Sequence, residues 1–148
     1  MARVLIVEDY RPLAGAIRMA IVREGHVAEQ CHSVREALAS QDNWDCAVLD
    51  VDLPDGNGVA LAEQLLAEGR VGSILFFTAS RDTVVLERAV RLGVVIDKSG
   101  GCDLLMAELG QMIEPEPCQR AVVAVAGGGG GTTIDSSSRS GMRRRVRQ

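Results

Sequence analysis

Aromatic residues make up only 3% of this 148-residue sequence, with one tryptophan, one tyrosine and two phenylalanines. A core must therefore be built from valine, leucine, isoleucine, alanine and methionine, and 47% apolar residues are ample for that purpose. Aliphatic layers of this kind suit an α/β fold. The length suits one folded unit of ordinary size and a shorter remnant.

Cysteine and histidine patterns that bind zinc are also lacking. The sequence has four cysteines and two histidines, namely Cys31, Cys46, Cys102, Cys118, His26 and His32. None of the cysteines forms a Cys-x-x-Cys pair, so a zinc site would have to draw its ligands from distant parts of the chain. We predict reduced thiols and a cytoplasmic protein. We expect both histidines to be surface or edge-strand residues.

Long hydrophobic runs are missing as well. No stretch approaches the roughly 20 apolar residues that a membrane helix needs. The apolar run near the amino terminus, Val4 to Val7, is too short for the core of a signal peptide. We therefore expect a soluble protein without a membrane span.

Charge divides the chain into two parts. Residues 1–114 carry ten basic and eighteen acidic residues, whereas residues 115–148 carry six basic and two acidic residues. Residues 114–148 also contain two prolines, a run of five glycines and a serine-rich run, and we predict a disordered linker and basic tail there. The tail lacks the interleaved aromatics of a base-stacking surface, so we do not predict specific nucleic-acid recognition.

Within residues 1–113, apolar runs alternate with segments of helical periodicity. The apolar runs predict five strands, at residues 3–7, 27–31, 45–50, 73–78 and 94–96. Helical periodicity predicts five helices, at about residues 12–24, 33–41, 58–68, 82–92 and 102–113. The second helix begins with a capping box, Ser33 to Glu36. This alternation favours a parallel sheet with right-handed crossovers and helices on both faces.

Polar residues stand at the ends of four predicted strands. Glu8 and Asp9 follow the first strand, Asp50 ends the third, Thr78 ends the fourth and Lys98 follows the fifth. Lys98 is the only lysine among sixteen basic residues. Parallel strands end at one edge of a sheet, where ligands of open α/β sheets bind, so we expect these five side chains to converge.

Three crowded carboxylates need a cation or a proton among them. An all-oxygen donor set favours Mg²⁺ over zinc. We expect Asp9 and Asp50 to bind Mg²⁺ directly and Glu8 to bind it directly or through a water. The backbone carbonyl of Asp52, two residues beyond the strand end, can supply another oxygen.

The remaining groups suggest phosphoryl transfer. Lys98 offers a mobile positive charge and Thr78 a hydroxyl, and with a metal these groups can neutralise the oxygens of a phosphoryl group. Asp50 is then the nucleophile that accepts it. The small side chain of Ala79 leaves room for the incoming group.

With these residues in place, residues 2–113 resemble a response-regulator receiver domain. In that comparison Glu8 and Asp9 match the acidic metal pair, Asp50 the phosphoacceptor, Leu53 to Gly58 the turn that follows, Thr78 and Ala79 the switch hydroxyl and its small neighbour, and Lys98 the site lysine.

The resemblance implies a flavodoxin-like, doubly wound sheet of five parallel strands in the order 2-1-3-4-5, with five helices. It implies a signalling protein rather than an enzyme, capable at most of self-phosphorylation from small phosphodonors and of self-dephosphorylation. Its partners would be a histidine kinase or phosphotransfer protein and an unidentified downstream protein, and it would be a monomer or a phosphorylation-dependent dimer. Phosphorylation would draw Thr78 inward and change the face of the fourth helix, fifth strand and last helix.

Three further expectations complete the interpretation. Residues after Ile113 are too few, and too rich in glycine and serine, for a usual DNA-binding output domain, so we expect a stand-alone or effector-less receiver. The short segment from Gly93 to Lys98, with Val95 in place of an aromatic and Ser99 in place of proline, makes an interaction module with impaired switching the main alternative. A Mg²⁺-dependent phosphohydrolase that uses an aspartyl-phosphate ranks last, because no cap domain is present.

Overall fold

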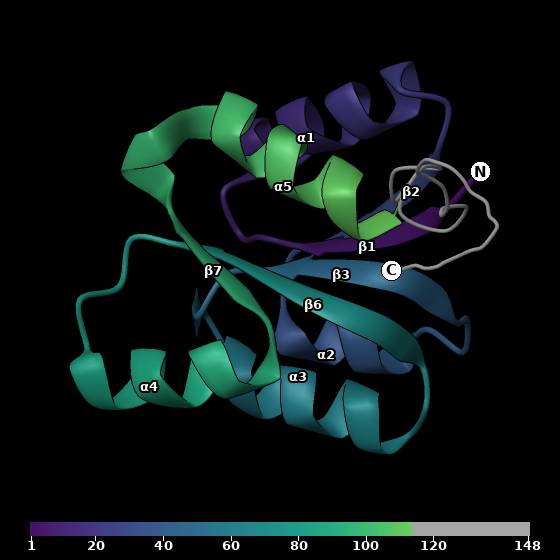
Figure 1. Cartoon of the computed structure of the whole chain (residues 1–148). Coiled ribbons are helices and arrows are strands. Elements are labelled where there is room, and N and C mark those ends of the chain that lie inside the picture. Colours follow the sequence, from purple (N-terminus) through teal and green to yellow (C-terminus); the bar gives the residue numbers. More distant parts are fainter. Residues whose placement is uncertain (114–148) are drawn as a thin grey trace, which may run out of the picture. The chain divides into compact units, whose positions relative to one another are not determined.

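A computed structural model of the chain describes residues 1–113. The predicted linker and basic tail, residues 114–148, lie outside the described residues. Five parallel strands form one sheet in the order β2-β1-β3-β6-β7 (Figure 1). The strands are β1 (Arg3–Val7), β2 (Val27–Cys31), β3 (Trp44–Leu49), β6 (Val71–Thr78) and β7 (Val94–Asp97). Both the predicted strand order and the edge position of the second strand are confirmed.

Helices cover both faces of the sheet. On one face lie α1 (Arg11–Arg23) and α5 (Gly101–Ile113), and on the other lie α2 (Val34–Ala39), α3 (Gly58–Ala67) and α4 (Thr83–Leu92) (Figure 1). Two hydrophobic clusters fill the two interfaces. Along β1, Val4 and Ile6 join one cluster while Leu5 and Val7 join the other. Because both faces are covered, the strands are continuous apolar runs in the sequence.

Three short features differ from the sequence expectation. Inside the predicted turn after Asp50, β4 (Asp52–Leu53) and β5 (Gly56–Asn57) form a small antiparallel hairpin. The second helix ends at Ala39, earlier than predicted, because Ser40 takes an extended conformation. A 3₁₀ turn, η1 (Lys98–Gly100), precedes α5.

His26 was predicted to be a surface or edge-strand residue, and it directly precedes the edge strand β2 but is buried. Only 7% of this residue is exposed, and it lies between α1 and β2, where its Nδ1 accepts the N–H of Ala2 at 2.9 Å. Its burial was not predicted because this partner belongs to the amino terminus, far away in the sequence. His32 follows the edge strand β2 and is half-buried.

Among residues 1–113, none of the helices is both long enough and apolar enough to cross a bilayer.

Candidate functional site

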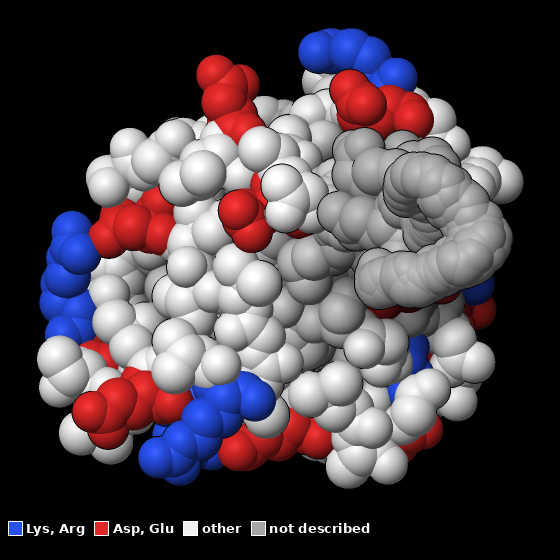
Figure 2. All heavy atoms as spheres, viewed as in Figure 1, with Lys and Arg blue, Asp and Glu red and all other residues white. Residues whose placement is uncertain are grey.

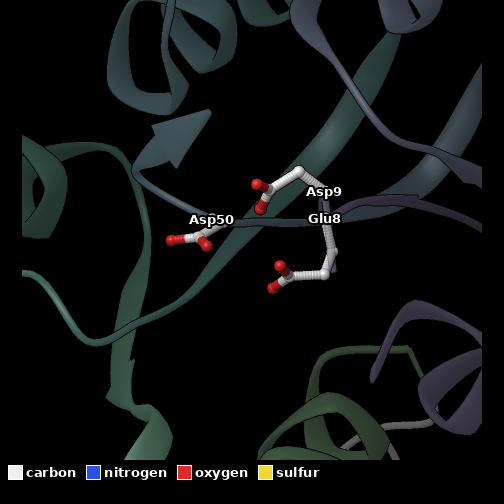
Figure 3. Close-up of side chains that lie close together, drawn as sticks. All are labelled: Glu8, Asp9 and Asp50. Atoms are coloured by element: carbon white, nitrogen blue, oxygen red, sulfur yellow. The ribbon is translucent and has the colours of Figure 1, made fainter. Parts of the chain in front are cut away.

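Acidic groups meet at the carboxyl ends of β1 and β3. These strands are neighbours in the sheet with Val7 opposite Leu49, so the residues that follow them, Glu8 and Asp50, also lie side by side. The backbone N–H of Asp50 donates to the carbonyl of Val7 at 3.0 Å and holds this register beyond the strands. Figure 3 shows the carboxylates of Glu8, Asp9 and Asp50 around a common space. One oxygen from each lies within 4.8 Å of the others.

Lys98 supplies a positive charge to this cluster. Its Nζ donates to Oδ2 of Asp50 at 2.8 Å and lies 2.9 Å from Oε1 of Glu8. The side chains of Glu8 and Asp50 are only 4% and 7% exposed, so an isolated negative charge on either would be costly. Lys98 therefore compensates two of the three carboxylates, and Asp9, which is exposed, adds a further negative charge.

This environment shifts the pKa values of Glu8 and Lys98. Burial raises the pKa of Glu8, and the hydrogen bonds from Lys98 and from the Tyr10 N–H offset this only in part. Burial by itself would lower the pKa of Lys98, but hydrogen bonds and charges from Asp50 and Glu8 outweigh it, so that this pKa is raised. The lysine is therefore held in its charged form next to the carboxylates.

Thr78 is buried at the end of β6, between the strands that lead to Asp50 and Lys98. Its Oγ1 accepts the N–H of Ser80 at 3.1 Å. Because the hydroxyl oxygen is the acceptor in that bond, its proton is left to donate elsewhere. The five residues selected from the sequence thus reach the same edge, with Thr78 bonded to its own loop and the other four grouped in the charged cluster.

The segment after Asp50 lies close to the acceptor. The Asp52 N–H donates to Oδ1 of Asp50 at 3.3 Å, so both oxygens of this carboxylate have a donor. The predicted role of the Asp52 carbonyl as a metal ligand stays a prediction. Where the chain enters α3, a Cβ on Gly58 would overlap the carbonyl oxygen of Asp50. Only glycine allows the backbone to pass so near the acceptor.

Sequence reasoning missed Asp97. This residue is opposite Thr78 in the β6–β7 pairing. Its Oδ2 lies 2.7 Å from Nη1 of Arg81, and its Oδ1 accepts the N–H of Ser99 at 2.8 Å. The bond from the Ser99 N–H is the main reason that the pKa of Asp97 is lowered. The sequence did contain a signal for this turn. An aspartate side chain often accepts the N–H of the residue two positions later. Here that residue is Ser99, which has an N–H to donate, whereas a proline at position 99 would have none.

The donor set fits a hard divalent cation. Carboxylates of Glu8, Asp9 and Asp50 provide only oxygen ligands, and one of the three is exposed, which leaves the cluster open to solvent. Oxygen ligands with room for retained waters are the environment that Mg²⁺ prefers. The described residues therefore fit the predicted Mg²⁺ site.

Comparisons with known sequences agree with one another. The response regulator receiver domain family matches residues 4–109. The chain is 32% identical over 95 residues to the transcriptional regulatory protein PcoR of Escherichia coli, a match covering 63% of this chain and 42% of that protein. It is 36% identical over 85 residues to the transcriptional regulatory protein TrcR of Mycobacterium tuberculosis, a match covering 56% of this chain and 33% of that protein. The matched region thus spans less than half the length of these relatives.

Solved structures show the same fold. The non-phosphorylated HemR receiver domain from Leptospira biflexa has a TM-score of 0.69 and 28% identity, over 78% of this chain and 97% of that one. The response regulator TrrA from Thermotoga maritima, in complex with Mg²⁺-BeF, has a TM-score of 0.68 and 21% identity, over 76% of this chain and 100% of that one.

Proposed function

Since this chain belongs to the response regulator receiver domain family, we propose that Asp50 accepts a phosphoryl group from a histidine kinase or a phosphotransfer protein. Domains of this family are signalling domains. We assign the domain to residues 1–113 and place the protein in the cytoplasm. The observation that supports the assignment most is the position of Lys98, whose ammonium contacts both Asp50 and Glu8.

We propose that the transfer step uses Asp50, Lys98 and Thr78. An oxygen of Asp50 forms a bond to phosphorus while the bond between phosphorus and the donor breaks, and the donor keeps the electron pair. Lys98 and the hydroxyl of Thr78 neutralise the phosphoryl oxygens. Glu8, Asp9, Asp50 and the carbonyl of Asp52 would hold Mg²⁺, which when bound supplies further positive charge to the same oxygens.

For the output we propose the face formed by α4, β7 and α5. Four large apolar side chains are exposed on these elements, and they are Val84, Val90, Val94 and Leu104. In Figure 2 these elements face the reader, and most of the charged side chains lie near the edge of the picture. Exposed apolar side chains can contribute to a contact with another protein. We propose that this face binds a downstream protein, or a second copy after phosphorylation.

The proposal is tested by intact-mass measurement after incubation with acetyl phosphate and Mg²⁺. The wild-type chain should gain the mass of one phosphoryl group, and chelation of Mg²⁺ should prevent the gain. Asp50→Asn should show no gain, whereas Asp103→Asn, at an exposed acid on α5, should behave as the wild type. A gain that persists in Asp50→Asn, or no gain in the wild type, would contradict the proposal.

A receiver with impaired switching is the second candidate, and Val95 favours it. This side chain is half-buried and packs against the hydrophobic cluster under α4, where a valine has no ring to move between buried and exposed positions. Amide hydrogen exchange with and without beryllofluoride and Mg²⁺ separates the two candidates. Altered protection in α4 and β7 supports a working switch, and unchanged protection there supports the interaction module.

A further inference from the structure

Asp55 joins the segment after the phosphoacceptor to a different helix. Its Oδ1 accepts the N–H of Val34 at 2.8 Å, and its Oδ2 accepts the N–H of Arg35 at 2.9 Å. These are the first two amides of α2, and no carbonyl within that helix can accept from them. In the sequence, Asp55 belongs to the turn that follows Asp50. The structure shows that its carboxylate binds two residues that lie 21 and 20 positions earlier in the sequence.

An apolar contact accompanies these hydrogen bonds. Gly56 packs against the side chain of Val34, and a Cβ on the glycine would lie 3.1 Å from Val34 Cγ2. Leu53 and Val34 are both partly buried against the same hydrophobic cluster. The β4–β5 hairpin therefore rests on the start of α2 through polar and apolar contacts together.

The other side of the hairpin contacts the acceptor. Its first residue, Asp52, donates an N–H to Asp50 Oδ1 at 3.3 Å, and Gly58 donates to the carbonyl of Val51 at 2.8 Å. The hairpin itself has only two pairs of residues, Asp52 with Asn57 and Leu53 with Gly56. So small a hairpin has little stability of its own, so its conformation depends on what anchors it.

We propose that Asp55 is a positioning residue for the phosphorylation site. By fixing the tip of the hairpin to α2, it holds the Asp52 N–H toward Asp50 and the Asp52 carbonyl at the edge where Mg²⁺ would bind. This inference rests on the proposed function of Asp50. Because the amides of Arg35 and Val34 lower the pKa of Asp55, the carboxylate stays charged and keeps both acceptor oxygens at neutral pH.

Ser33 provides a matched control on the same helix. Its Oγ accepts the N–H of Glu36 at 3.1 Å, so Ser33→Ala also removes a cap from α2, but Ser33 makes that bond within the start of the helix and not to the hairpin. Asp55→Ala and Ser33→Ala should lower the melting temperature by similar amounts. A positioning role, unlike a loss of helix stability, predicts that the two variants differ in their affinity for Mg²⁺.

The experiment is calorimetric titration of the wild type, Asp55→Ala, Asp55→Asn and Ser33→Ala with Mg²⁺. We expect Asp55→Ala to raise the dissociation constant about tenfold, as loss of a group that orients a metal ligand commonly does. Asp55→Asn keeps one acceptor oxygen and should lie between Asp55→Ala and the wild type, and Ser33→Ala should match the wild type. Amide exchange of the metal-free proteins should show faster exchange at residues 52–57 in Asp55→Ala than in Ser33→Ala.

Three results overturn the inference. The first is wild-type affinity in Asp55→Ala or, if that variant does not fold, in Asp55→Asn. The second is an equal loss of affinity in Ser33→Ala, which would mean that the stability of α2 alone matters. The third is a wild-type chain that binds no Mg²⁺, and this result would overturn the proposed Mg²⁺ site as well. If the wild type binds Mg²⁺, the first or second result overturns only the role of Asp55.

Discussion

Gly58 shows how tightly single residues are constrained near the acceptor. A Cβ at this position would overlap the carbonyl oxygen of Asp50 and lie 3.1 Å from the Cα of Val51, both of them backbone atoms that cannot rotate away. Gly58→Ala should therefore lower the free energy of unfolding by about 1–3 kcal/mol, as overpacking does, which urea denaturation would measure.

Gly15 is the matched control. It lies inside α1, and a Cβ at this position would meet nothing within 4 Å. Gly15→Ala should therefore raise the free energy of unfolding by about 0.5–1 kcal/mol through the higher helix propensity of alanine. Equal effects of the two substitutions would contradict the close approach of Gly58 to Asp50.

Cys46 gives the protein a pH dependence in the alkaline range. Burial raises the pKa of this thiol from 9.0 to about 11. Between these values the unfolded chain has lost the thiol proton while the folded chain keeps it, so the free energy of unfolding falls as the pH rises. The contribution of Cys46 is on the order of 2 kcal/mol over this window.

Replacement of Cys46 by alanine isolates this contribution. Stability measured by urea denaturation at pH 9, 10 and 11 should fall less steeply in Cys46→Ala than in the wild type. Parallel curves for the two proteins would show that the thiol is not protected from ionisation in the folded state.

Among single residues, the sequence predicted the positions of those that directly follow a strand. Glu8, Asp9, Asp50 and Lys98 needed only the parallel order of the strands to be brought together. Asp55 and His26 could not be placed in this way, because their partners, Val34 and Ala2, become neighbours only after the sheet and helices have packed.

Among the elements, helix starts were the most predictable. The Ser33 side chain accepts from Glu36 as the capping box requires, but Glu36 reaches back to the N–H of His32 at 2.9 Å instead of to Ser33. Asp82 caps α4 by accepting from Val84 and Val85 at 3.1 and 3.3 Å. Caps depend on residues close in sequence, so the sequence alone can indicate them, as it did for Ser33.

Asp82→Ala should lower the free energy of unfolding by about 1 kcal/mol, because the first amides of α4 lose their acceptor. Asp82→Ser keeps a capping oxygen and should stay within a few tenths of a kcal/mol of the wild type. Thermal denaturation of the three proteins measures the difference. A serine variant as unstable as the alanine variant would argue against capping.

The β4–β5 hairpin was less predictable, whereas the junction of α4 with β7 lies where the sequence predicted it. Strands of two residues leave no periodicity to detect. At the junction, α4 ends at Leu92 and β7 begins at Val94, with only Gly93 between them. A Cβ on Gly93 would overlap the carbonyl oxygen of Ile74, so glycine lets the helix pass directly into the strand. The short segment before Lys98 is thus accommodated without displacing the lysine from Asp50.

For the molecule as a whole, Mg²⁺ binding should raise thermal stability. A ligand that binds only the folded state stabilises it, by about 1.4 kcal/mol at a concentration ten times the dissociation constant. That corresponds to a rise in melting temperature of roughly 3–8 °C for a domain of this size.

Calorimetry with MgCl₂, compared with NaCl at the same ionic strength, would measure this rise. Asp9→Asn removes a proposed ligand and should abolish it, whereas Asp103→Asn should not. An equal rise with both salts would indicate charge screening instead of a metal site.

Phosphorylation of Asp50 is the central claim, and locating the phosphoryl group on the chain tests it most directly. After incubation with acetyl phosphate and Mg²⁺, borohydride reduction converts an aspartyl-phosphate to homoserine, and peptide mass mapping locates the modified residue. We predict homoserine at position 50 in the wild type, only with Mg²⁺ and donor both present. Modification at Glu8, Asp9 or Asp52 instead, or none in any Mg²⁺-dependent manner, would contradict the account.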